Sequence, residues 1–187
     1  REVTANLLPA LNLNRAYQPS PDLLAYQKLY GLDRLQCQYW QGYIDMPLFK
    51  LHTQVFEPKD VPVQGTVFLL HGYLEHSGIY QPIIREILAQ GFSVLVFDLP
   101  GHGLSSGSPA SIQDFNHYQD VLRAVYHYVK NADQLPKPWL GIGQSTGGAI
   151  FMHHLLAYAE QRKNPFVDRV LLLSPLVRPA KTAWWHN

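Results

Sequence analysis

The chain has 187 residues, of which 47% are hydrophobic and 16% are charged, and its formal net charge is +1. These values are typical of one globular domain with a sizeable core, and they exclude an intrinsically disordered chain. Because the net charge is close to zero and the basic residues are scattered, we expect no nucleic-acid partner.

The chain contains a single cysteine, Cys37, so no disulfide can form within it. Cys37 lies among strand-forming residues, and we interpret it as a small buried hydrophobic side chain. No apolar run approaches the ~20 residues that a membrane-spanning helix needs, and the N-terminus lacks the pattern of a signal peptide. We therefore expect a cytoplasmic protein, and membrane association stays open.

The first part of the chain predicts one helix followed by an antiparallel hairpin. Ser20-Pro21-Asp22 combines an N-cap, a proline at the first helical position and an early acid, and Gly31 ends the helix. Aromatic and β-branched residues are frequent over residues 35–56, and Asp45-Met46-Pro47 is typical of the turn between two strands. We expect residues 1–34 to be an extension that precedes the domain core.

After Gly65, apolar strands alternate with amphipathic helices. Strands buried on both faces are expected over residues 66–70, 93–97, 140–143 and 168–173. Helices are expected from Ile79 to Gly91, from a Ser111 cap through Val129, and over residues 148–160. Such alternation implies an α/β fold, with a mostly parallel sheet, helices on both of its faces and the antiparallel hairpin at its N-terminal side.

The segment Gly143-Gln144-Ser145-Thr146-Gly147 connects one of these strands to the following helix. This spacing is typical of a serine held at a sharp turn with a positive φ, so that its hydroxyl group stands clear of the sheet. The two glycines allow the strand and the helix to pass close together. For an isolated match, a glycine-rich turn with an incidental serine is the alternative interpretation.

Four loop motifs follow the four expected parallel strands: His71-Gly72-Tyr73, the segment from Asp98 to Ser105, the Ser145 turn, and Ser174-Pro175. Taken in this order, they resemble the α/β-hydrolase superfamily of serine hydrolases. Within it, the segment from His71 to Tyr80 is similar to the monoacylglycerol lipase and lysophospholipase group, which is S33 serine aminopeptidase-like. The resemblance predicts a hydrolase core at residues 35–175 and the start of a lid or a tail at residues 176–187.

This resemblance implies a site built around Ser145 as the nucleophile. The backbone N–H groups of Thr146 and Tyr73 would form the oxyanion hole, and Thr146 lies at a helix N-terminus that favours an anion. The residues expected near the substrate pocket are His71, Gly72, His76 and Gln144. The implied substrates are carboxylic esters, with monoacylglycerol-like or lysophospholipid-like lipids favoured, and the implied reaction passes through an acyl-enzyme on the serine.

The catalytic acid and base do not follow from this sequence. In this fold the acid and the histidine come after the serine, beyond further strands. His153 and His154 lie on the helix that runs away from the turn, and we expect them to be solvated or core residues. His186 is in the wrong topological position, and Asp98 is expected to shape its loop. We therefore expect an incomplete hydrolase core without its C-terminal strands, inactive alone, whose remaining part would supply the acid and the histidine.

Other interpretations stay open at this stage. A peptidase or a thioesterase of the same fold would share these motifs, and so would a catalytically silent binding protein. The pair Trp184-Trp185 lies near basic residues and fits either a lipid headgroup layer or packing against a further part of the protein. No dinucleotide fingerprint and no Cys/His cluster with ligand spacing is present, so we expect no cofactor and no metal.

Overall fold

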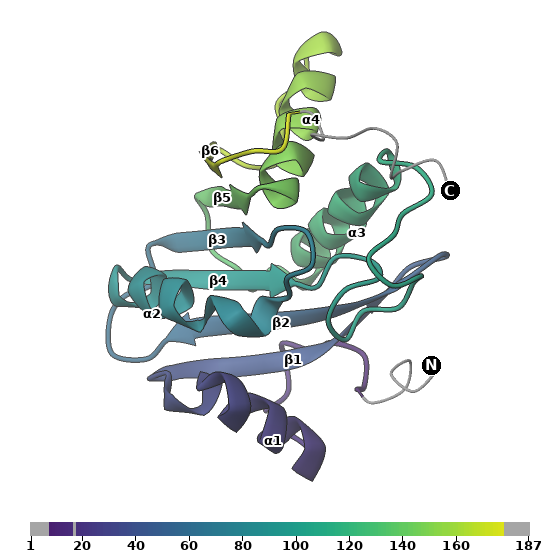
Figure 1. Cartoon of the computed structure of the whole chain (residues 1–187). Coiled ribbons are helices and arrows are strands. Elements are labelled where there is room, and N and C mark those ends of the chain that lie inside the picture. Colours follow the sequence, from purple (N-terminus) through teal and green to yellow (C-terminus); the bar gives the residue numbers. More distant parts are fainter. Residues whose placement is uncertain (1–7, 17, 178–187) are drawn as a thin grey trace.

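The computed structural model describes residues 8–16 and 18–177. Within these residues, the strands form one sheet in the order β1-β2-β4-β3-β5-β6 (Figure 1). The strands are β1 (Cys37–Asp45), β2 (Lys50–Pro58), β3 (Gly65–Leu70), β4 (Phe92–Phe97), β5 (Trp139–Gln144) and β6 (Arg169–Leu173). β1 pairs antiparallel with β2, β2 pairs antiparallel with β4, and the other neighbouring strands are parallel. The predicted mostly parallel sheet with an N-terminal antiparallel hairpin is confirmed.

The helices cover both faces of this sheet, as predicted. They are α1 (Pro21–Tyr30), α2 (Gln81–Ala89), α3 (His117–Ala132) and α4 (Thr146–Glu160), with short 3-10 helices η1 (Leu32–Arg34) and η2 (Ser77–Tyr80). Successive strand residues point to opposite faces. Phe68 of β3 therefore packs in the core formed with α3 and α4, whereas Leu69 packs in the core formed with α2.

Local signals place the first helix correctly. The Ser20 hydroxyl accepts a hydrogen bond from the Leu23 N–H at 3.5 Å, and Gly31 ends α1 with a φ of 68°. The prediction for α3 is wrong at its start, because the helix begins at His117 and not after a Ser111 cap. The Asp114 carboxylate accepts the Asn116 N–H at 2.8 Å, and such a local bond competes with helix formation.

The last strand differs from the prediction in its burial. β6 was expected to be a buried strand that a further strand of the fold would cover, but among the described residues it pairs only with β5 and forms an edge of the sheet. Leu171 and Leu173 remain 56% and 37% exposed as a result. The apolar composition of a strand predicts burial, but its place in the sheet decides whether a neighbour is present to cover it.

Two further expectations fall partly or wholly outside the described residues. Trp184-Trp185 and His186 belong to the end of the chain that the structure does not describe, and only residues 176–177 of the expected lid or tail are described. None of the helices described in residues 8–16 and 18–177 is both long enough and apolar enough to cross a membrane.

Candidate active site

Ser145 occupies a strained backbone position between β5 and α4. Its φ is 47° and its ψ is −110°, so the positive φ that the Gly-x-Ser-x-Gly spacing predicts is confirmed. The Ser145 N–H donates to the carbonyl of Leu173 at 2.9 Å, and its own carbonyl accepts from the N–H groups of Ala149 and Leu176 at 2.9 and 3.0 Å. The exit of β6 and the first turn of α4 thus hold the strained residue in place.

The two glycines of the motif lie where side chains would collide with the backbone. A Cβ atom on Gly143 would lie 2.6 Å from the carbonyl carbon of Gly147, and one on Gly147 would lie 2.5 Å from the carbonyl oxygen of Leu70. Both distances are far below any normal contact. The glycines therefore let α4 begin directly against β5 and β3, which is the geometry that the sequence spacing predicts.

The loop after β3 lies against the serine. A Cβ atom on Gly72 would lie 3.4 Å from the Cβ atom of Ser145, so the next residue, Tyr73, is close to the turn. Thr146 opens α4, where the first backbone N–H groups have no partner within the helix and carry the positive end of the helix dipole. Tyr73 and Thr146 also line one cavity together. The N-terminus of α4 and the loop that carries Tyr73 therefore border the same space beside Ser145.

A carboxylate that sequence reasoning did not single out supports this loop. Oε2 of Glu75 accepts the Gly72 N–H at 2.8 Å and lies 2.5 Å from the Tyr80 hydroxyl. The same hydroxyl lies 2.7 Å from Oε1 of Gln144, the residue before Ser145. Burial and the neighbouring Glu75 carboxylate both raise the pKa of Tyr80, so its hydroxyl stays protonated. The network connects the loop after β3 to the end of β5.

The cavity beside the turn has a volume of about 420 Å³. It lies between α4 and the segment that leads into α3, and it is lined by Tyr73, Ala110, Ile112, Phe115, Tyr118, Thr146, Ala149, Met152, His153, Leu156, Leu176 and Val177. Most of these side chains are apolar. The residues from 110 to 115 reach the cavity because the chain there forms turns rather than the helix that the sequence predicts.

The four residues expected near the substrate pocket are not among those that line this cavity, and their contact with a substrate stays a prediction. Gly72 and Gln144 belong to the Glu75 network. His71 is buried, and its Nε2 accepts the N–H of Leu99 at 2.8 Å while its Nδ1 lies 2.7 Å from the Gly72 carbonyl. Burial lowers the pKa of His71, which fits a neutral ring that joins the loops after β3 and β4.

His76 has a different environment from the other expected pocket residues. Its Nδ1 accepts the Gly78 N–H at 3.2 Å, so the side chain caps η2. Its ring centroid lies 4.8 Å from that of Tyr30 on α1. A contact between His76 and a substrate therefore stays a prediction.

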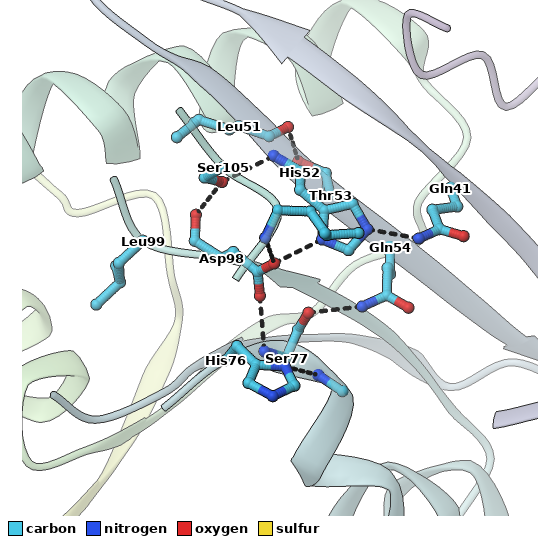
Figure 2. A network of polar contacts seen from close by, with 12 residues as sticks. Gln41, Leu51, His52, Thr53, Gln54, His76, Ser77, Asp98, Leu99 and Ser105 are labelled. Carbon is cyan, nitrogen blue, oxygen red and sulfur yellow. Dashed lines mark hydrogen bonds and ion pairs between the residues drawn. The ribbon is translucent and has the colours of Figure 1, made fainter. Parts of the chain in front are cut away.

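Asp98 lies at the centre of a polar network, and its contacts agree with the loop-shaping role expected for it (Figure 2). Its carboxylate accepts the N–H groups of Ser77 and Leu104 at 2.7 and 2.8 Å, and it lies 2.7 Å from Nδ1 of His52. Burial alone would raise the pKa of Asp98. The His52 side chain and the hydrogen bonds outweigh burial and hold that pKa well below its usual range. Asp98 thus joins the loop after β4 to β2 and to η2.

The two neighbouring histidines on α4 have distinct surroundings. His154 is buried, and burial, together with His153 and Arg123, lowers its pKa to about 4. His153 is half-buried and lines the cavity. His154 is thus a core residue, one of the two environments predicted for these histidines. His153 instead faces the cavity beside Ser145. Across residues 8–16 and 18–177, no three His, Cys, Asp or Glu side chains are grouped in a way that would hold a metal ion.

The strand order, the turn at Ser145 and the loops at the carboxyl ends of the parallel strands define an α/β-hydrolase fold. Solved structures agree. The monoacylglycerol lipase of Paleococcus ferrophilus superposes with a TM-score of 0.56 at 27% identity, over 72% of this chain and 47% of that chain. Est1E of Butyrivibrio proteoclasticus, solved with ferulic acid bound, superposes with a TM-score of 0.60 at 28% identity, over 71% of this chain and 52% of that chain.

Sequence comparison identifies the family. Residues 61–187 match Hydrolase_4, described as serine aminopeptidase, S33, and the chain belongs to this family. It is 32% identical to human monoglyceride lipase over 159 residues, which are 84% of this chain and 46% of that protein. It is also 32% identical to caffeoylshikimate esterase of Arabidopsis thaliana over 112 residues, which are 59% of this chain and 34% of that protein. The chain thus spans less than half the length of these curated relatives. The predicted resemblance to the monoacylglycerol lipase group is confirmed.

Proposed function

We propose that this chain carries the nucleophile and the oxyanion-binding loop of a serine hydrolase that cleaves carboxylic esters. The observation that carries the proposal is the strained conformation of Ser145, with a φ of 47°, at the N-terminus of α4 beside an apolar cavity. A positive φ at a non-glycine residue is costly, and such strain is concentrated at functional sites. Two relatives, a monoglyceride lipase and an esterase, support the same reaction class.

In the proposed reaction, Oγ of Ser145 attacks the carbonyl carbon of the ester. The oxyanion that forms accepts hydrogen bonds from the N–H groups of Thr146 and Tyr73, and each such donor lowers the barrier by about 3–4 kcal/mol. Collapse of the tetrahedral intermediate expels the alcohol and leaves an acyl-enzyme on Ser145. Water then attacks this ester, the same donors stabilise the second intermediate, and the free acid leaves.

The proposal requires a base that removes the proton from the Ser145 hydroxyl. The histidines near the site have other partners: His52 contacts Asp98, His71 contacts Gly72 and Leu99, and His153 contacts Gln119. We therefore assign the base and its orienting acid to a part of the protein that the structure does not describe.

The apolar lining of the cavity suits the acyl group of the substrate, and we assign that group to this cavity. Its volume of about 420 Å³ is within the range of small-molecule sites, and burial of apolar surface favours binding by about 25 cal/mol per Å². With the ester carbonyl between Thr146 and Tyr73, the acyl group extends along α4 toward Met152 and Leu156. Monoacylglycerols and lysophospholipids have such an acyl group next to a polar alcohol.

The test is a substrate panel for the full-length protein, which includes the part that supplies the base, and for its Ser145→Ala variant. The panel contains a monoacylglycerol, a lysophosphatidylcholine, an acyl thioester and an aminoacyl amide. We expect the two lipid esters to be the best substrates and the variant to lose at least about a thousandfold in rate, in line with losses of a serine nucleophile. Preferred cleavage of the amide or the thioester would contradict the ester assignment. Tight binding of the lipids without any turnover would indicate a silent binding protein.

A further inference from the structure

His153 is a polar residue in a mostly apolar part of the cavity. It lies on α4, two turns beyond Ser145, and its neighbours in the cavity lining include Met152, Leu156 and Phe115. The centroids of the His153 and Phe115 rings are 5.8 Å apart. A half-buried imidazole in such surroundings needs a hydrogen-bond partner for each ring nitrogen, or it loses free energy relative to water.

Among residues 8–16 and 18–177, one of the two nitrogens of His153 has a hydrogen-bond partner. Its Nδ1 lies 3.3 Å from Nε2 of Gln119 on α3. The same amide nitrogen lies 3.2 Å from the backbone carbonyl of Ile150. A carbonyl oxygen only accepts, so the Gln119 side chain must present its NH₂ group to Ile150 and to His153. Nδ1 of His153 is therefore an acceptor.

The contact made by the oxygen of the Gln119 amide is consistent with this orientation of the side chain. Its Oε1 lies 3.3 Å from Nδ1 of His154 and can only accept, so His154 carries its proton on Nδ1. The pKa of His154 is lowered to about 4, chiefly by burial, and the ring is therefore neutral near pH 7. Nε2 of His154 is buried and has no hydrogen-bond partner in the described part of the chain, which is consistent with a nitrogen that carries no proton.

These contacts determine the tautomer of His153. When Nδ1 accepts from Gln119, the proton of the neutral ring lies on Nε2, which is then a hydrogen-bond donor. We propose that His153 is a specificity-determining residue of the cavity, and that its Nε2–H hydrogen-bonds a hydroxyl oxygen carried by the acyl group of the substrate. The inference deepens the proposed function and rests on it, because it assumes that the acyl group occupies this cavity.

The position of His153 indicates where that hydroxyl would lie. At 1.5 Å per residue, the eight residues from Ser145 to His153 correspond to about 12 Å along α4. The oxygen would thus be far from the scissile carbonyl, near the end of a medium-length acyl chain. An unsubstituted chain would bury the Nε2–H group without an acceptor, which makes the hydroxylated ester the better substrate. Gln119 acts as a positioning residue that holds His153 in the donating tautomer.

The tautomer is measured directly by long-range ¹H–¹⁵N NMR of the histidine side chains in the Ser145→Ala variant. We expect His153 to be in the Nε2–H form. In the Gln119→Met variant, which loses the amide donor but keeps a similar length, we expect a mixture of both neutral forms. A dominant Nδ1–H form in the presence of Gln119 would overturn the inference.

The selectivity is measured as binding, so that it does not depend on turnover. The probes are a monoacylglycerol whose acyl chain ends in a hydroxyl group and its unsubstituted counterpart, titrated against the Ser145→Ala variant by calorimetry. We expect the preference for the hydroxylated probe to fall about threefold to tenfold when His153→Leu is added, since one neutral hydrogen bond is lost. His153→Gln retains a donor and is expected to restore part of the preference.

Leu156→Ala is the matched control for this binding experiment. It removes an apolar contact in the same cavity and is expected to weaken both probes equally. An unchanged preference in His153→Leu would overturn the role of His153. The outcome is separate from that of the proposed function: loss of all esterase activity in the substrate panel would refute the function, while the two binding constants would still decide the role of His153.

Discussion

The backbone N–H of Gly72 donates a hydrogen bond of 2.8 Å to Oε2 of Glu75. This contact holds the residue immediately before Tyr73, whose own N–H group is the proposed second oxyanion donor. Because Glu75 also contacts Tyr80, and Tyr80 contacts Gln144, the loop after β3 and the end of β5 are positioned by one partly buried network. Catalysis of the proposed kind is sensitive to such positioning.

Glu75→Ala is therefore expected to impair the site without unfolding the protein. Misplacement of a catalytic group by about 1 Å can cost about a hundredfold in rate, and we expect a loss of that order in kcat for an ester substrate. Glu75→Gln is expected to lose less, because its amide oxygen still accepts the Gly72 N–H. The control is Glu86→Ala on the exposed side of α2, where the carboxylate pairs with Arg85 at the surface. Equal rates in the Glu75→Ala and Glu86→Ala proteins would refute this role.

Gly147→Ala is expected to destabilise the protein. The added Cβ atom would lie 2.5 Å from the carbonyl oxygen of Leu70, and neither backbone can move without disturbing β3 or α4. Steric overpacking in a core costs about 1–3 kcal/mol, and we expect a loss at the upper end of that range in urea unfolding. Gly148→Ala, whose Cβ atom would lie 3.0 Å from the nearest atom, is expected to lose less. The reverse order would argue against the close approach of α4 and β3.

Asp98→Asn is expected to cost about 3 kcal/mol of unfolding free energy, because it takes the carboxylate acceptor away from buried hydrogen-bond donors, and each buried donor left unpaired costs about 1–3 kcal/mol. The amide has one oxygen for two backbone donors, the N–H groups of Ser77 and Leu104, so one donor is left unpaired. The pKa of Asp98 is lower in the folded protein than its ordinary value of 3.8. Its stabilising effect is therefore complete above about pH 4 and is lost as the pH falls toward the folded-state pKa.

Asp60→Asn is the control for this substitution, because Asp60 is an exposed loop residue. Urea titrations of both variants and of the unchanged protein at pH 7 supply the comparison. A loss for Asp98→Asn no larger than that for Asp60→Asn would contradict the structural role of the buried carboxylate.

His154 predicts a second pH dependence, in a different window. Its pKa falls from 6.5 to about 4 on folding, so between these values the unfolded chain binds a proton that the folded protein does not. The free energy of unfolding is then highest above about pH 6.5 and falls as the pH is lowered toward 4. In His154→Phe, whose ring can pack on Phe166, we expect a smaller loss of stability between pH 7 and pH 5. Identical slopes in both proteins would show that His154 is not the group responsible.

The elements that the sequence predicted well are those with local signals. Ser20 and Gly31 mark the ends of α1 through contacts within a few residues. The glycines around Ser145 indicate the turn because they have no side chain where strand and helix approach closely. The parallel strands were predicted from continuous apolar runs, because a strand with helices on both faces has no polar side.

The features that the sequence did not predict depend on contacts between distant segments. The network from Glu75 through Tyr80 to Gln144 joins residues that are 69 positions apart, and no local pattern encodes that meeting. A partial signal was present, since Glu75 and Tyr80 lie in the segment that carries the resemblance to the lipase group. The exposure of Leu171 likewise depends on the place of β6 in the sheet and not on its composition.

The most direct test of the central claim is the site of reaction with a fluorophosphonate, which forms a covalent bond with an activated serine. The full-length protein, which includes the part that supplies the base, is incubated with the reagent, digested, and analysed by peptide mass spectrometry. We predict that the adduct lies on Ser145 and that labelling is absent in Ser145→Ala. Labelling that persists in this variant, or an adduct on another serine, would contradict the account.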